Sequence, residues 1–185
     1  MRELFNFILI IIISILFAGA YGIIHDQITF SISPEYYTLL KFPQFEIEQL
    51  QLASRIKVGI VGFLATWWVG LFLGIAYAFI SLFFDTIHIL SITVKSILIN
   101  LCIAFISGIL GYFYSILFLS PKNIDWYIPL ETQEIQNYIN VGSIHNFGYL
   151  GGVTGLLVGI IYQIRKAKQR YHYRSFDLGI FIFNY

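Results

Sequence analysis

Two histidines and two carboxylates are the side chains in this sequence that could do metal chemistry: His25, Asp26, Glu35 and His145. Imidazole nitrogens and carboxylate oxygens bind catalytic zinc, and two histidines with one carboxylate leave a position open for water. The spacing argues against a site, because there is no His-x-x-x-His pair and neighbours on a strand point to opposite faces. The sequence alone therefore favours hydrogen bonds that tie two loops together, without a cofactor, and zinc binding is the alternative.

Three of these four residues lie in the stretch 21–37, where polar and apolar side chains alternate. The polar positions fall on every second residue from 25 to 33, and the apolar positions between them are Ile24, Ile28, Phe30 and Ile32. A period of two predicts a short β-strand, in which Asp26 is the one violation. Ser33-Pro34-Glu35 then predicts a helix start, with Ser33 as N-cap and a short helix through about residue 40.

The composition indicates the environment that must position these residues. Of 185 residues, 58% are hydrophobic and only 11% are charged, against a charged share of about 25% in soluble domains. Segments of about 20 apolar residues span a bilayer, and four are predicted, at 5–24, 58–84, 96–119 and 147–164. The fold class is an all-α membrane protein, a four-helix transmembrane bundle in one domain, 1–185.

The remaining segments form the predicted loops and tail. Outer loops 25–57 and 120–146 would make a small extracytoplasmic cap that includes the short β segment, and 165–185 would be a basic cytoplasmic tail. Residues 46–52 are expected to form an interfacial helix that leads into the second span. Ala18-Gly19-Ala20 has the form of a signal-peptide cleavage site, but the apolar run continues to residue 24, which favours a retained anchor.

The distribution of positive charge predicts the orientation. The termini and the connection 85–95 hold seven Lys and Arg residues: Arg2, Lys95, Arg165, Lys166, Lys168, Arg170 and Arg174. The two long loops hold four: Lys41, Arg55, Lys57 and Lys122. Because positive charge is retained on the cytoplasmic side, both termini are predicted to be cytoplasmic. The tail could also bind anionic lipid, although its charge is explained by topology alone.

Small residues recur four positions apart in the second and fourth spans. The positions are Gly70, Gly74 and Ala78, and Gly148, Gly151, Gly152, Gly155 and Gly159. Such ridges let helices approach closely in lipid, and packing within one bundle is favoured over contact between subunits. Trp67-Trp68 is interpreted as packing as well.

Three sequence elements carry a resemblance: His25-Asp26-Gln27-Ile28-Thr29, Ser33-Pro34-Glu35-Tyr36 and Ala65-Thr66-Trp67-Trp68-Val69-Gly70. With them the chain resembles a family of bacterial four-span integral membrane proteins, over residues 1–80 and the glycine-rich fourth span. The resemblance implies a bacterial cytoplasmic (inner) membrane and a retained first span. It implies no activity and no catalytic roles.

The sequence favours a non-enzymatic interaction or assembly component, because it has no glycine-rich phosphate loop and no Gly-x-Ser-x-Gly elbow. A second copy or another membrane protein would be the partner, and the net charge of +1 does not indicate nucleic acid. The first alternative is a membrane-embedded metal-binding protein or hydrolase that uses the four residues named first. The second is a small oligomeric channel or carrier, with a path lined by Thr66, Asn100, Ser107 and Thr154.

Overall fold

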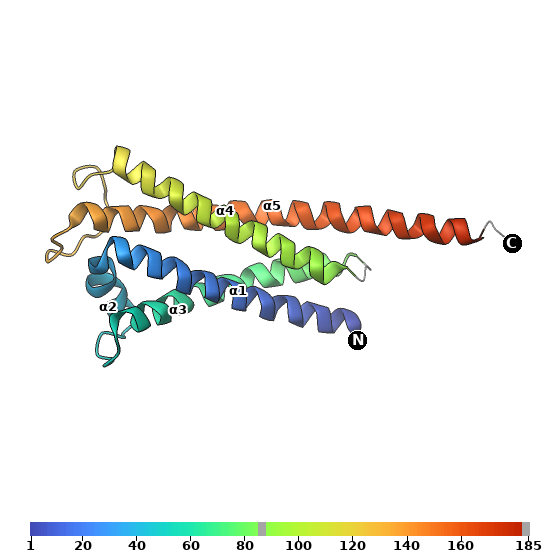
Figure 1. Cartoon of the computed structure of the whole chain (residues 1–185), viewed down its shortest axis with the longest axis horizontal. Helices are drawn as coiled ribbons and strands as arrows, with labels where there is room; N and C mark the ends of the chain where they lie inside the picture. Colours follow the sequence, from blue (N-terminus) through green and yellow to red (C-terminus); the bar gives the residue numbers. More distant parts are fainter. Residues whose placement is uncertain (85–87, 183–185) are drawn as a thin grey trace.

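The computed structural model is a bundle of long helices (Figure 1). It describes the backbone of residues 1–84 and 88–182, and the side chains of these residues up to 169. The elements are α1 (Arg2–Ile32), η1 (Tyr36–Lys41), α2 (Phe42–Gln44), α3 (Ser54–Ser81), α4 (Ile89–Phe118) and α5 (Ile135–Ile182). Helices α1, α3, α4 and the Ile135–Gln169 part of α5 are long and apolar enough to cross a membrane. The chain is thus a multi-pass helical membrane protein.

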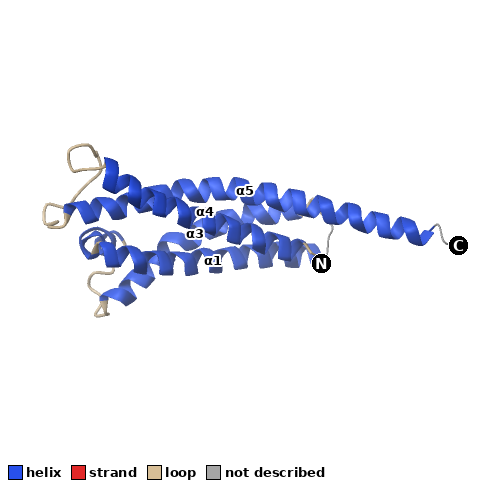
Figure 2. Ribbon diagram, turned by 45° about the horizontal axis from the view of Figure 1, so that its top comes forward, coloured by secondary structure: helices blue, strands red, loops and turns tan. Residues whose placement is uncertain are grey.

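The four long helices form two closely packed pairs, α1 with α3 and α4 with α5 (Figures 1 and 2). Glycines bring the paired backbones together. A Cβ on Gly70 of α3 would lie 2.6 Å from the carbonyl oxygen of Ser14 on α1, and a Cβ on Gly151 of α5 would lie 2.6 Å from Cβ of Ser107 on α4. The prediction that these ridges pack within the bundle is confirmed at five positions, Gly70, Gly74, Gly151, Gly155 and Gly159.

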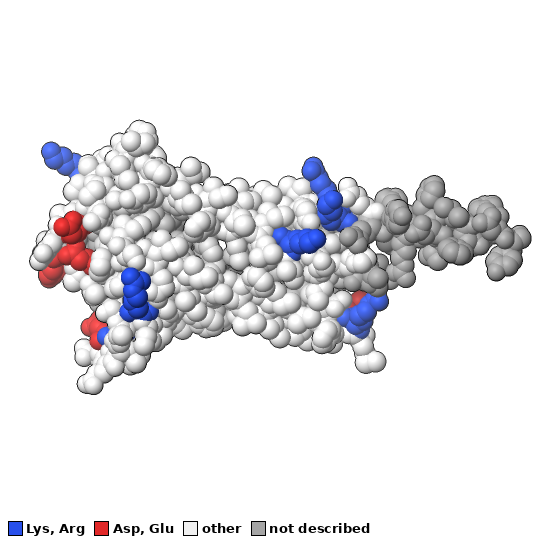
Figure 3. All heavy atoms as spheres, viewed as in Figure 1, with Lys and Arg blue, Asp and Glu red and all other residues white. Residues whose placement is uncertain are grey.

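The two ends of the bundle differ. One end, here called the loop end, carries η1, α2 and the loops 45–53 and 119–134; the other, the terminal end, carries the start of α1 and the connection between α3 and α4 (Figure 1). Most acidic side chains on the face shown in Figure 3 lie at the loop end. The side chains of Arg170, His172 and Arg174 and the residue Asp85 lie outside the described residues.

The predicted strand is wrong, because α1 stays helical through Ile32, and no strand occurs in the described ranges. The pattern of polar residues fits a helix as well as a strand, because His25, Thr29 and Ser33 are about one helical turn apart and share a helical face. The Thr29 hydroxyl donates to the His25 carbonyl oxygen at 3.2 Å, a bond that keeps a polar residue inside a helix. A helix also satisfies its own backbone groups in lipid, which a lone strand cannot do.

The predicted helix start at Ser33 is confirmed. Ser33 has an extended backbone, with φ −140° and ψ 95°, and its Oγ accepts the backbone N–H of Tyr36 at 3.3 Å. The helix that follows is π-helical over η1 and then continues as α2. The prediction of an interfacial helix over residues 46–52 is wrong. This segment consists of turns and irregular backbone before α3, and Glu46 has a φ of 56°.

All four predicted spans correspond to helices, but each helix begins before its predicted span. The largest difference is at α5, which begins at Ile135 rather than at 147, so that His145 lies inside the helix and not in a loop. The loop before α5 is shorter than predicted for the same reason. The second predicted outer loop is therefore helical over residues 135–146 and irregular before them.

Candidate functional site

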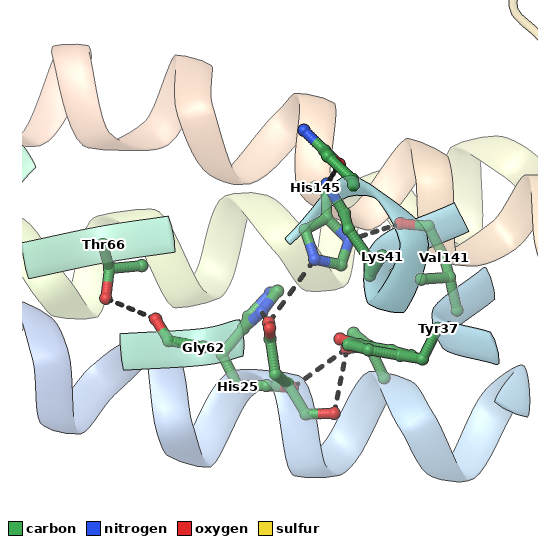
Figure 4. A network of polar contacts seen from close by, with 10 residues as sticks. His25, Tyr37, Lys41, Gly62, Thr66, Val141 and His145 are labelled. Atoms are coloured by element: carbon green, nitrogen blue, oxygen red, sulfur yellow. Dashed lines mark hydrogen bonds and ion pairs between the residues drawn. The ribbon is translucent and has the colours of Figure 1, made fainter. Parts of the chain in front are cut away.

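His25, Asp26 and His145 come together near the loop end, between the two helix pairs (Figure 4). One carboxylate oxygen, Asp26 Oδ1, lies 3.2 Å from His25 Nδ1 and 3.5 Å from His145 Nε2. The three residues are buried, with exposed fractions of 9%, 4% and 9%. Asp26 is six residues before the end of α1, which places it about 9 Å inside the helix end. A carboxylate at that depth needs partners to offset its desolvation.

The hydrogen bond that His145 makes on α5 determines where its proton is. His145 Nδ1 lies 2.9 Å from the backbone carbonyl oxygen of Val141, one turn earlier (Figure 4). A carbonyl oxygen can only accept, so Nδ1 carries the N–H. In the neutral imidazole Nε2 is then an acceptor, and this atom faces Asp26.

The contact between Asp26 and His145 thus brings two acceptor atoms together. An acceptor lone pair and a carboxylate oxygen repel each other unless a positive species bonds to both. That species is either a second proton on the imidazole or a metal ion. The bond from Nδ1–H to a backbone carbonyl is the contact that orients a metal-binding histidine.

His25 has one ring nitrogen on the carboxylate and one without a partner. Its Nδ1 contacts Asp26, and its Nε2 is buried with no hydrogen-bond partner in the described part of the chain. The ring stacks on Tyr21 at a centroid distance of 5.4 Å and meets the His145 ring edge-on at 5.0 Å. These contacts fix the ring plane, so Nδ1 stays directed at Asp26.

Tyrosines cover the loop-end side of the cluster. Tyr36 stacks on His145 with a centroid distance of 5.1 Å, and the Tyr138 ring lies 5.0 Å from Tyr36. The Tyr37 hydroxyl lies 2.5 Å from the hydroxyl of Thr29. Burial raises the pKa of Tyr36 and of Tyr37 well above the usual range, and the charge of Asp26 acts in the same direction. Both tyrosines therefore remain neutral and cover the carboxylate without adding charge.

Glu35 is not brought into this cluster. Its two carboxylate oxygens accept the backbone N–H groups of Gln133 at 3.1 Å and Glu134 at 2.9 Å, directly before α5. This is a capping arrangement, in which an anion binds the unpaired donors at a helix N-terminus. Glu35 positions the helix that carries His145 and is not a neighbour of the histidines.

A cavity of about 390 Å³ opens beside the cluster, between the two helix pairs. Its charged and titratable lining groups at the loop end are His25, Asp26, Lys41, His145, Tyr21 and Tyr149. Burial lowers the pKa of Lys41, an effect that the charge of Asp26 opposes. His25 also lines a second cavity of about 210 Å³. The cluster is therefore buried in the protein but adjoins open volume.

The donor set suits a divalent metal. One ligand atom from each of the three residues lies within 4.8 Å of the others. Ligand atoms held about 2.0–2.1 Å from a tetrahedral zinc are about 3.3 Å apart, and the two nitrogen-to-oxygen distances here are 3.2 and 3.5 Å. The remaining separation, between the two imidazole nitrogens, is no more than 4.8 Å. The residues present thus fit a site with two histidines and one carboxylate.

Sequence reasoning identified His25, Asp26 and His145 as candidates but did not identify two residues that lie beside them. Tyr21 and Lys41 line the cavity beside the cluster, and no local pattern singles out either residue. Trp68, interpreted as packing, is also in the cavity wall and is 48% exposed.

The four residues suggested for an oligomeric channel lie in different surroundings within the single chain. Thr66 and Asn100 line the cavity, Ser107 packs against Gly151, and Thr154 is exposed on α5. Within one chain, therefore, they do not form a continuous polar surface.

Comparison of the chain with protein-family models, with curated proteins and with solved structures found no match.

Proposed function

We propose that the protein is a membrane-embedded metal-binding protein that holds a divalent ion, zinc by its ligand chemistry, at His25, Asp26 and His145. The observation that supports this most strongly is the orientation of His145, whose Nδ1–H is bonded to Val141 while Nε2 faces the carboxylate at 3.5 Å. Zinc bonded to Nε2 and Asp26 would supply the positive species that this contact requires. It would also account for the burial of Asp26, which is 4% exposed.

The ligand count bears on the chemistry that such an ion could support. Three protein ligands leave the fourth position of a tetrahedral zinc for water, whereas structural zinc sites are filled by four side chains. Zinc lowers the pKa of a bound water to about 7. The open position would face the cavity that the three residues line. The site is thus suited to hydrolysis as well as to metal storage or sensing.

We also propose a bacterial cytoplasmic membrane, with both termini in the cytoplasm and the loop end outside. The distribution of charge supports this orientation, because exposed Arg165, Lys166 and Lys168 lie toward the terminal end. Packing supports retention of the first span: Ile10 and Ser14 are buried, with exposed fractions of 1% and 2%. Cleavage after Ala20 would remove the part of α1 against which Gly70 of α3 packs.

The metal content of the purified protein tests the proposal. The protein is equilibrated with equimolar Zn²⁺ in mild detergent, freed of unbound metal and analysed for zinc by elemental mass spectrometry. One zinc per chain is expected in the wild type, and His25→Ala and His145→Ala should lose it. His88→Ala changes a histidine near the terminal end and is the matched control. A wild type without zinc, or variants that keep it, would overturn the proposal.

A role as an interaction or assembly component is the second candidate, and the loop before α5 favours it. Leu130 and Tyr127 in that loop are 99% and 70% exposed, a position where a partner would bury them. Crosslinking in native membranes tests this role. A defined crosslinked species that disappears in Leu130→Ser would support it, and recovery of only the uncrosslinked chain would count against it.

A further inference from the structure

The cavity between the helix pairs has the shape of a site for one lipid chain. Along α5 its wall runs from His145 to Leu156, a rise of about 16 Å. That length is about half of the roughly 30 Å hydrocarbon core of a bilayer, so it matches the thickness of one leaflet. Its volume of about 390 Å³ lies within the range of about 300–1,000 Å³ found for ligand pockets.

The walls of the cavity are apolar and open toward the bilayer. Trp68 and Phe72 on α3 and Val153 on α5 line it, and they are 48%, 64% and 65% exposed. Gly148 and Gly152 on α5 leave space in the cavity, because they have no side chain and a Cβ on either glycine would meet no atom within 4 Å. These two glycines therefore differ from Gly151 and Gly155, against which α4 packs directly. A chain from the surrounding leaflet could enter sideways.

The charge at the loop end of the cavity indicates the headgroup. Asp26 is already in contact with two histidines. Lys41, in contrast, donates to the neutral amide of Gln44 at 3.0 Å, and its Nζ lies 5.6 Å from the centre of the Tyr36 ring. No ion pair of Lys41 occurs among the residues that the structure describes. A partly buried ammonium without an anionic partner is complementary to an anionic headgroup.

We propose that this cavity binds one acyl chain of an anionic phospholipid from the leaflet at the loop end, with Lys41 next to the headgroup. The chain would lie along Gly148 and Gly152, and the region where its ester joins the headgroup would lie near His25 and His145. The proposal depends on the cavity walls and on Lys41, and not on a bound metal. This inference can therefore fail or succeed independently of the metal site.

Binding of lipids by native mass spectrometry tests it, with phosphatidylglycerol compared with phosphatidylcholine of the same acyl chains. The wild type should prefer phosphatidylglycerol about fivefold, the factor that about 1 kcal/mol for one positive charge provides. Gly152→Leu places a side chain in the cavity and should lower the binding of both lipids. Lys41→Gln should keep chain binding and lose the preference for phosphatidylglycerol.

Two variants outside the cavity serve as matched controls. Thr154→Leu adds similar bulk at an exposed position of α5, and Lys122→Gln removes an exposed lysine of the loop before α5. Both should bind lipid as the wild type does, which shows that neither added bulk outside the cavity nor loss of an exposed lysine accounts for the effects of the cavity variants. Thermal unfolding of the same samples shows that each variant is folded. Equal binding of the two lipids by the wild type, or unchanged binding by Gly152→Leu, would overturn the inference.

Discussion

Asp26 on α1 lies 3.5 Å from His145 on α5, and this contact joins the two helix pairs near the loop end. A second link lies elsewhere in the bundle, where Gln163 of α5 donates to the backbone carbonyl oxygen of Tyr77 on α3 at 3.1 Å. Residues 119 positions apart in the sequence thus meet through one polar contact near the loop end. A ligand bound there would hold the pairs together. Zinc is consequently expected to stabilise the whole bundle and not only the site.

Thermal unfolding in detergent measures that stabilisation. Zinc at a hundred times its dissociation constant should raise the free energy of unfolding by about 2.7 kcal/mol, a midpoint shift of roughly 5–10 °C for a chain of this size. Asp26→Asn removes the shared negative ligand and should abolish the increment, whereas His88→Ala should retain it. An equal zinc-dependent shift in Asp26→Asn would show that the metal acts elsewhere.

The variant Glu35→Gln tests whether Glu35 caps the start of α5 or binds the metal. The substitution removes the charge that accepts the N–H groups of Gln133 and Glu134, so it should destabilise the protein by about 1 kcal/mol. Zinc stoichiometry should stay at the wild-type value, because Glu35 is not among the residues of the cluster. Loss of zinc together with normal stability would instead make Glu35 a ligand.

Neighbouring glycines on α5 should respond differently to one added methyl group. Gly151→Ala places Cβ 2.6 Å from Ser107 Cβ and should cost about 1–3 kcal/mol by overpacking α4 against α5. Gly152→Ala meets no atom within 4 Å and should be neutral or slightly stabilising. Unfolding midpoints of the two variants give the comparison. Similar losses in both would mean that the side of α5 at Gly152 is also packed.

The existence of the four spans could be predicted because lipid demands long apolar helices, whatever their partners. The helix ends could not, because the polar part of α1 satisfies its hydroxyl groups inside the helix: Ser31 donates to the Gln27 carbonyl at 3.0 Å, as Thr29 does to His25. The same residues produced the alternation that was interpreted as a strand. Over nine residues the two periods overlap, and only the environment decides between them.

The site could be predicted by residue type but not by position. His25, Asp26 and His145 were candidates, yet their meeting depends on how α1 packs on α3 and α5 on α4, which no local pattern encodes. Glu35 was grouped with them because it is close in sequence. The chain turns at Ser33, where the backbone is extended, and this turn directs Glu35 to the start of α5 instead.

Labelling of single cysteines in intact cells tests the orientation. In a Cys102→Ser background, Leu130→Cys at the loop end should react with a membrane-impermeant maleimide, since Leu130 is 99% exposed. Lys168→Cys, exposed on α5 toward the terminal end, should react only after permeabilisation. The reverse pattern would place both termini outside the cytoplasm and the loop end within it.

X-ray absorption at the zinc edge tests the central claim most directly, because it identifies the atoms bonded to the metal. The account predicts two imidazole nitrogens and one or more oxygens at about 2.0–2.2 Å in the wild type, and loss of the zinc-edge signal in His145→Ala. A spectrum with sulfur, with no imidazole, or without change in His145→Ala would contradict a zinc site at His25, Asp26 and His145.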